Sequence, residues 1–160
     1  MPTKRITDIA AEWTRAKEGA LEFIDAIPDN LLGFYPVPEV FNFALQYIHI
    51  AGANYLFASG IFGIENPFDR SKGGEPEKNE ELQRDKAALK EFVGGSYDFV
   101  IGGLMSVDPA TLEDDVQFHK WTMSRASMIG KALEHHAHHR GQTAVYFRIN
   151  GLKPPAEHLF

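Results

Sequence analysis

Apolar residues recur at intervals of three and four along four long stretches of this chain, and this spacing restricts the chain to a helical fold. The clearest stretch lies near the N-terminus, where apolar residues run from Ile6 to Ile27 and charged residues fill the positions between them. A helix turns once every 3.6 residues, so this spacing places the apolar side chains on one face. We expect a first helix that ends before Pro28 and buries Trp13 and Phe23 in the core.

The second and third stretches are also predicted as helices. The second, residues 38–60, opens with a proline, which suits the first turn of a helix because its missing N–H is not needed there. The third, residues 76–100, opens with a proline followed by acidic residues, which favour the positive end of a helix. Each glycine of the Gly94-Gly95 pair costs about 1 kcal/mol in a helix, so the pair predicts either a closely approaching neighbour or a local bend.

The fourth stretch begins near Thr122 or Ser124 and runs to Asn150, with Gly151 as the expected left-handed stop. Residues 61–76 are rich in glycine and proline and predict a loop, either a rim or lid over one end of the fold or an exposed connection. Residues 102–120 are irregular, and the sequence VQFHKW predicts a short extended piece in which His119 is exposed.

Four helical stretches without an internal repeat or convincing β-alternation predict an all-α, four-helix bundle, and residues 1–160 are enough for a single domain. The chain contains no cysteine, which excludes disulfides, thiolate metal sites and a cysteine nucleophile. Its net charge of −6 argues against a nucleic-acid partner. We see neither an apolar run of membrane-spanning length nor a signal-peptide core, so we expect a cytoplasmic protein without a membrane partner.

The fourth helix carries a dense histidine cluster in the sequence HHAHHRGQ, residues 135–142. His135 and His139 are four residues apart on one face, the spacing by which a helix offers two imidazoles to one metal ion. The pairs His135 with His138 and His136 with His139 are alternatives at a spacing of three, while His136 and Arg140 share another face. Spacing alone leaves these choices open, and a weakly basic surface patch is a further alternative.

One more histidine, His49, lies on the apolar stripe of the second helix, between Leu45 and Gly52. A single histidine on such a face is usually a core residue with a hydrogen-bond partner. However, an ionisable group that faces the core must be satisfied, and the small Gly52 and Ala53 leave room beside it. A third ligand for the histidine pair is therefore the alternative interpretation.

The ending HHAHHRGQTAVYFRINGLKPP resembles that of the DinB/YfiT-like superfamily, a damage-inducible family of metal-binding four-helix bundles. The resemblance rests on His135 and His139 directly before Arg-Gly-Gln, followed by an aromatic-containing helix that closes in Asn-Gly and prolines. A histidine near the middle of the second helix, here His49 in QYIHIAGANYLF, also matches the family. The resemblance spans nearly the whole chain, is specific in the last helix, and implies that His49, His135 and His139 are the metal ligands.

This resemblance implies a divalent metal ion, zinc or nickel first, with iron or cobalt as alternatives. Three imidazoles without a fourth protein ligand leave an open coordination position, as in catalytic zinc sites. Some relatives are transferases that use low-molecular-weight thiols. We therefore expect a metal-dependent, thiol-dependent transferase or a hydrolase of a small molecule, and the alternative is a non-catalytic stress-response module in which the metal joins two helices.

The remaining roles follow from the same resemblance. His136, His138 and Arg140 are expected around the metal site, towards the substrate or on the surface, and Gly141 is expected to permit tight helix contact. For Arg140, a structural ion pair at the bundle surface and an anion-binding role are the two alternatives. No acid or base stands out, although three carboxylates are candidates: Glu134, Asp98 and Asp115. Relatives are often homodimers and 12% of the residues are aromatic, so we expect a homodimer through helix faces.

Overall fold

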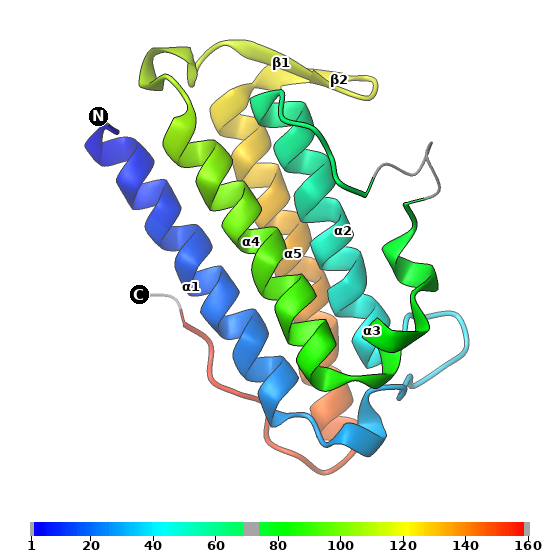
Figure 1. Ribbon diagram of the computed structural model, residues 1–160. Helices are drawn as coiled ribbons and strands as arrows, with labels where there is room; N and C mark the ends of the chain where they lie inside the picture. Colours follow the sequence, from blue (N-terminus) through cyan, green and yellow to red (C-terminus); the bar gives the residue numbers. More distant parts are fainter. Residues whose placement is uncertain (1, 69–73, 159–160) are drawn as a thin grey trace.

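Four long helices lie side by side in a computed structural model that describes residues 2–68 and 74–158 (Figure 1). The all-α, four-helix bundle predicted from the sequence is confirmed. Its long helices are α1 (Lys4–Ala26), α2 (Phe43–Phe62), α4 (Lys86–Ser106) and α5 (Arg125–Ile149). The shorter elements are α3 (Glu80–Arg84), β1 (Asp115–Phe118), β2 (Trp121–Ser124) and 3-10 turns at Asp29–Leu31, Pro76–Lys78 and Pro109–Thr111.

The apolar stripe of α1 packs into the core as its spacing predicts. Trp13 is fully buried and Phe23 nearly so, and the Trp13 ring lies 6.0 Å from that of Tyr97 on α4. Helix α4 packs most extensively against α1 and α2, and α2 packs in turn against α5. The interface between α2 and α5 matters for function, because the candidate ligands lie on these two helices.

The second helix begins later than predicted. Pro38 lies in a turn, and α2 starts at Phe43 because Asn42 has extended backbone and its side chain accepts a hydrogen bond from the N–H of Leu45. An asparagine in this position satisfies one of the unpaired N–H groups at a helix start. Gly63 ends the helix in the left-handed conformation, with a φ of 69°.

The third helix is divided into three pieces rather than running continuously from Pro76. Asn79 and Asp85 both have extended backbone, which interrupts the helix, and each side chain accepts hydrogen bonds from two backbone N–H groups ahead of it. Each residue therefore ends one segment and starts another. The consequence is that the first turn, Pro76–Lys78, lies against α2 rather than in line with α4.

The Gly94-Gly95 pair lies inside α4, which continues past it to Ser106. A Cβ atom on Gly94 would lie 3.6 Å from Lys17 of α1, and one on Gly95 would lie 3.4 Å from the hydroxyl of Tyr55 on α2. These are ordinary contacts with the ends of side chains, so neighbouring residues pack against both glycines without requiring glycine at either position.

Strands β1 and β2 form a hairpin across one end of the bundle (Figure 1). The expected extended piece is present, and it is paired, with Phe118 opposite Trp121. His119 is exposed, as expected, and takes a positive φ of 52° in the turn. A Cβ atom on Gly60 would lie 2.8 Å from the Phe118 ring, so this glycine lets the hairpin pack directly on α2.

Helix α5 ends as predicted, because Gly151 has a φ of 70° and follows the last turn. The segment after it turns back beside α1 (Figure 1), where His158 lies 2.7 Å from the carboxylate of Glu22. In the described part of the chain, no helix combines the length and apolar character needed to cross a membrane.

Candidate metal centre

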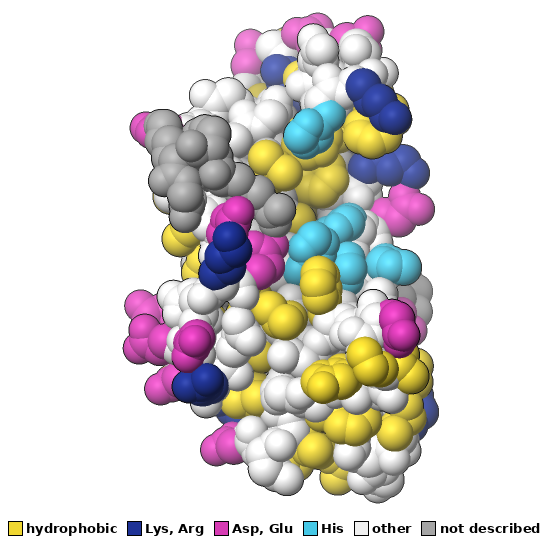
Figure 2. Space-filling model, turned by 90° about the vertical axis from the view of Figure 1, so that its right-hand side faces the viewer, with side chains coloured by type: hydrophobic (Ala, Val, Ile, Leu, Met, Phe, Trp, Pro, Cys, Tyr) yellow, Lys and Arg dark blue, Asp and Glu magenta, His cyan; other side chains and the backbone are white. Residues whose placement is uncertain are grey.

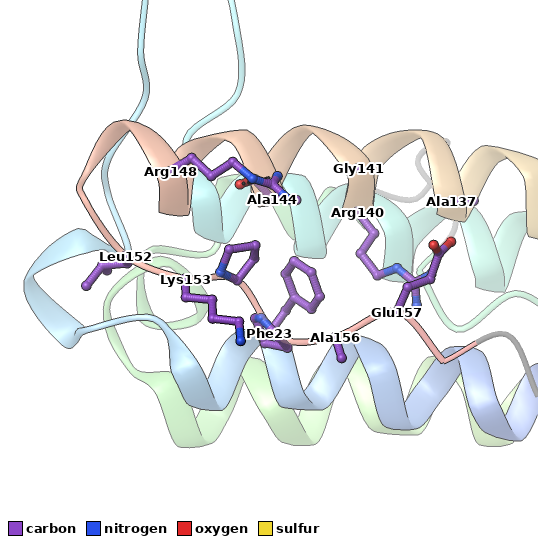
Figure 3. A pocket seen from close by; sticks show the side chains of 12 residues that line it. Phe23, Ala137, Arg140, Gly141, Ala144, Arg148, Leu152, Lys153, Ala156 and Glu157 are labelled. Carbon is purple, nitrogen blue, oxygen red and sulfur yellow. Dashed lines mark hydrogen bonds between the residues drawn. The ribbon is translucent and has the colours of Figure 1, made fainter.

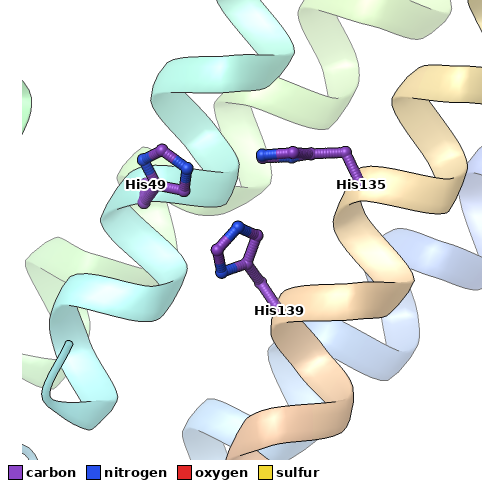
Figure 4. Close-up of side chains that lie close together, drawn as sticks. All are labelled: His49, His135 and His139. Carbon is purple, nitrogen blue, oxygen red and sulfur yellow. The ribbon is translucent and has the colours of Figure 1, made fainter. Parts of the chain in front are cut away.

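His49, His135 and His139 converge between α2 and α5 (Figure 4). Each ring offers a nitrogen, and these three nitrogens all lie within 4.8 Å of one another. The ring centres are 5.2 Å apart for His49 and His135, and 4.6 Å apart for each of the other two pairs. The structure therefore brings together the three histidines that the resemblance implied, and it places His135 and His139 on one face of α5.

The spacing of these nitrogens fits a common metal ion. Two nitrogens bound tetrahedrally at about 2.1 Å to one zinc ion lie about 3.4 Å apart, so modest rotations of the rings suffice to bring all three into contact with one ion. Among the described residues, no further histidine or carboxylate belongs to the group. Three nitrogen donors with no fourth are the donor set of a catalytic rather than a structural zinc site.

The pair on α5 is held in the neutral form that metal binding requires. Burial, reinforced by the neighbouring His49 and His138, lowers the pKa of His135 to about 4. Burial also lowers the pKa of His139 to about 4, with smaller effects from His49, His135 and His138. Both rings are half-buried and uncharged at neutral pH, so a nitrogen lone pair is available on each without the loss of a proton.

A buried glutamine fixes the orientation of His139. The Nδ1 atom of His139 lies 2.7 Å from Oε1 of Gln46, which is 1% exposed. The amide nitrogen of Gln46 donates to the hydroxyl of Tyr146 and to Oε1 of Gln142, and the Tyr146 hydroxyl donates to the carbonyl of Phe41. Because the Gln46 amide already donates to these acceptors, its Oε1 accepts the proton of Nδ1, and Nε2 of His139 is left to bind a metal.

A carboxylate lies beside His49. Oε1 of Glu77 is 3.6 Å from Nδ1 of His49, and both side chains are largely buried. Glu77 reaches this place because the Pro76–Lys78 turn packs over Gly52, where a Cβ atom would lie 3.7 Å from Oε1 of Glu77. Gly52 does leave room beside His49, as its small size suggested. A carboxylate next to the second nitrogen of a ligand histidine is a common arrangement in zinc sites.

The other residues of the cluster lie away from this group. His136 is 2% exposed and packs edge-on against Tyr97 in the core, so the expectation that it borders the metal site or the surface is wrong. Burial and the charge of Arg140 lower its pKa to about 3. His138 is exposed and accepts a hydrogen bond from Gln142. Gly141 is also exposed, and a Cβ atom there would meet nothing within 4 Å, so its expected role in tight helix contact is wrong too.

None of the three carboxylates suggested by the sequence joins the histidine group. Glu134 is exposed and pairs with Lys131, Asp98 pairs with Lys17 of α1, and Asp115 is exposed at the start of β1. Glu77 and Gln46, which do lie beside the histidines, were not predicted from the sequence. Gln46 had a usable signal, because it lies one helical turn before His49 and is polar within an apolar stretch.

An apolar pocket of about 230 Å³ lies near the histidine group, separated from His135 by Phe57. The ring of Phe57, in its wall, is centred 6.0 Å from that of His135 and stacks on Phe118 of the hairpin at 4.6 Å. Figure 2 shows histidine side chains gathered on one face of the molecule, beside a hydrophobic area. The pocket is lined by Phe57, Phe118, Trp121, Met123, Met128 and Lys131.

Comparison with known proteins agrees with this architecture. The sequence profile of the DinB superfamily matches residues 12–143. A DinB-like protein from Bacillus cereus ATCC 10987 has a similar structure, with a TM-score of 0.73, 19% identity, and coverage of 94% of this chain and 95% of that one. A DinB-like protein from Bacillus subtilis, YjoA, has a TM-score of 0.68 at 18% identity, with coverage of 93% and 96%. No curated protein sequence matches the chain.

Proposed function

Since the chain belongs to the DinB superfamily, we propose that its three histidines hold a divalent metal ion and that the protein is a metal-dependent enzyme acting on a small molecule. The observation that carries the proposal is the convergence of His49, His135 and His139 without a fourth described ligand, next to an apolar pocket. An ion held in this way keeps a coordination position for an exchangeable ligand. We infer zinc or nickel as the metal, with iron or cobalt as alternatives, because imidazole nitrogens suit all four.

When bound in such a site, a divalent ion lowers the pKa of a water molecule or a thiol towards neutrality and polarises a carbonyl group. The protein's own residues supply the rest. Gln46 holds His139 in the tautomer that presents Nε2, and Glu77 lies where it can orient His49 or accept a proton from an incoming ligand. Phe57 and Phe118 offer an apolar wall to the part of a substrate that extends beyond the ion.

Thiol transfer is the reaction class that we propose first, because the family resemblance implies it, with hydrolysis as the second possibility. Both need a nucleophile whose proton is removed near neutral pH, and the chain has no cysteine to serve as one. A low-molecular-weight thiol would act as a co-substrate. The apolar pocket favours an acceptor with a hydrophobic group.

The competing interpretation is a binding protein without turnover, in which the ion only joins α2 to α5. The adjoining pocket favours the enzyme, because an ion with a purely structural role needs neither an open coordination position nor space beside it.

Metal analysis of the untagged protein tests the site itself. We expect about one ion per chain by elemental mass spectrometry, and its loss in both His49→Ala and the His135→Ala/His139→Ala double variant. His138→Ala is the matched control, because this exposed histidine lies in the same stretch but outside the group. If the metal is retained without His49, or lost equally with His138→Ala, the three-histidine site is refuted.

A second experiment separates the enzyme from the structural module. Cobalt(II) is substituted into the protein, and its visible spectrum is followed as a low-molecular-weight thiol is added. A spectral change that saturates would show that a thiol reaches the open position, and acceptors with apolar groups would then be screened for thiol transfer. A spectrum that does not respond to thiols, with no turnover in the screen, would favour the structural module.

A further inference from the structure

A second cavity, of about 690 Å³, lies on the other side of α5 from the histidine group, between α5, α1 and the C-terminal segment (Figure 3). Its floor and walls include the apolar side chains of Phe23, Leu152 and Pro154. The cavity is within the size range of pockets that hold small organic ligands, roughly 300–1,000 Å³. The contact of His158 with Glu22 holds the C-terminal segment beside α1 and so keeps this wall in place.

Three cations line the cavity: Arg140, Arg148 and Lys153. Glu157 is the acidic residue among the lining residues, so the wall carries two more positive than negative charges. The protein as a whole has a net charge of −6, and a locally positive cavity in such a protein favours an anionic ligand.

Three of the five described lysines and arginines without an ion pair line this cavity, and the other two are Lys120 and Arg125. Of the lysines and arginines that the structure describes, nine form ion pairs with aspartate or glutamate. Arg140, Arg148 and Lys153 form none with the described residues, although Arg148 does donate a hydrogen bond to the carbonyl of Ala144 in its own helix. Three cations without carboxylate partners around one apolar cavity are suited to an anion that comes from outside the chain.

Arg140 is placed for this role by the residue opposite. It is half-buried, and its guanidinium group lies over α1, where a Cβ atom on Gly19 would be 2.6 Å from Nη1. Glycine at position 19 therefore lets the arginine extend across the gap between the two helices. Figure 3 shows Arg140 and Arg148 on the same helix, with Phe23 of α1 and Lys153 of the C-terminal segment on the opposite side of the cavity.

We propose that this cavity binds a small organic anion, a carboxylate or phosphate attached to an apolar body, at a site separate from the metal centre. Its cations contact the charged group, while Phe23 and Leu152 pack against the apolar part. The proposal does not depend on the proposed enzyme activity, because no lining residue of the cavity belongs to the histidine group.

Calorimetric titration of the full-length, metal-loaded protein tests this. The probes are 1-naphthyl phosphate, 1-naphthoate, 1-naphthol and inorganic phosphate, so that head group and apolar body are compared separately. We expect one of the two naphthyl anions to bind at one site per chain, and naphthol and phosphate to bind at least about tenfold more weakly, because each lacks half of the interaction. The tighter of the two anions identifies the head group. Equal binding of naphthol would show an apolar cavity only and would overturn the proposal.

Variants locate the binding site. The Arg148→Gln/Lys153→Gln double variant should weaken binding of the anion about tenfold or more. Gly141→Leu should block the cavity, because Gly141 lines it. The fold can accept this leucine, since a Cβ atom on Gly141 meets nothing within 4 Å. Arg84→Gln is the control for the change in net charge, because it removes an exposed cation that does not line the cavity, and it should leave binding of the anion unchanged. The His135→Ala/His139→Ala variant should still bind the anion. If it does not, the anion binds at the metal and the second site is refuted.

Discussion

Replacement of Gln46 with methionine removes the acceptor of the His139 Nδ1–H while keeping a side chain of similar size in the same buried position. The hydrogen bond that is lost is 2.7 Å long and links two helices. Loss of such a partner to a ligand histidine costs about 10- to 100-fold in metal affinity, which corresponds to about 1.4–2.7 kcal/mol. The fold itself should lose only about 1 kcal/mol, because the Tyr146 hydroxyl keeps its bond to the Phe41 carbonyl and the half-buried His139 can reach water.

Zinc affinity would be measured by competition with a chromophoric chelator, and stability by chemical denaturation of the metal-free protein. Gln46→Glu is the rescue variant, because a carboxylate still accepts from Nδ1 and should leave the affinity at or above that of the parent. Gln142→Met is the matched control, since it removes a bond to Gln46 but leaves the contact of Gln46 with His139 in place.

Two results would contradict the predicted role of Gln46. If Gln46→Met binds zinc within about threefold of the parent, the contact does not orient a metal ligand. If Gln46→Glu binds as weakly as Gln46→Met, the loss comes from disturbed packing of α2 against α5 rather than from the missing acceptor.

Two further predictions concern stability and assembly. Gly102→Ala should stabilise α4 by up to about 1 kcal/mol, because a Cβ atom there meets nothing within 4 Å. Gly103→Ala should destabilise the protein by about 1–3 kcal/mol, because a Cβ atom at this position would lie 2.4 Å from the Phe62 ring. Urea unfolding measures both variants, and equal unfolding midpoints for Gly102→Ala and Gly103→Ala would contradict the prediction. The expected homodimer stays a prediction, and we propose that it forms through the exposed Val145 and Ile149 of α5. Light scattering coupled to sizing should then show a dimer for the parent protein and a monomer for Val145→Glu/Ile149→Glu, and a monomeric parent would refute it.

Periodicity was sufficient to predict the bundle, most clearly for α1, whose buried residues from Ile6 to Ile24 share one face, whereas the buried face of α5 also includes the polar His136 and Thr143. It failed where local hydrogen bonding decided the structure: Asn42, Asn79 and Asp85 start helices with their side chains, and these capping residues overrode the helix starts suggested by Pro38 and Pro76.

The candidate site was predictable in part for a related reason. His135 and His139 share a face through a spacing of four, which the sequence shows directly. Gln46 and His139 are 93 residues apart in the sequence, yet they form a hydrogen bond. Glu77 lies beside His49 only because the helix is interrupted at Asn79, which lets the preceding turn pack over α2. Contacts of this kind depend on how the helices pack, and the spacing of residues within one helix carries no information about them.

The position of the hairpin at one end of the bundle affects how mutations can alter the apolar pocket. The three histidines belong to α2 and α5. Phe118, Trp121 and Met123 of the apolar pocket come from the hairpin, residues 115–124, within the connection from α4 to α5, whereas its other lining residues, Phe57, Met128 and Lys131, lie on α2 and α5. Half of the pocket lining is therefore encoded outside the two helices that carry the histidines, and half within them. Under the proposed function, mutation of this short hairpin, or its exchange between relatives, would alter half of the substrate wall and leave His49, His135 and His139 unchanged.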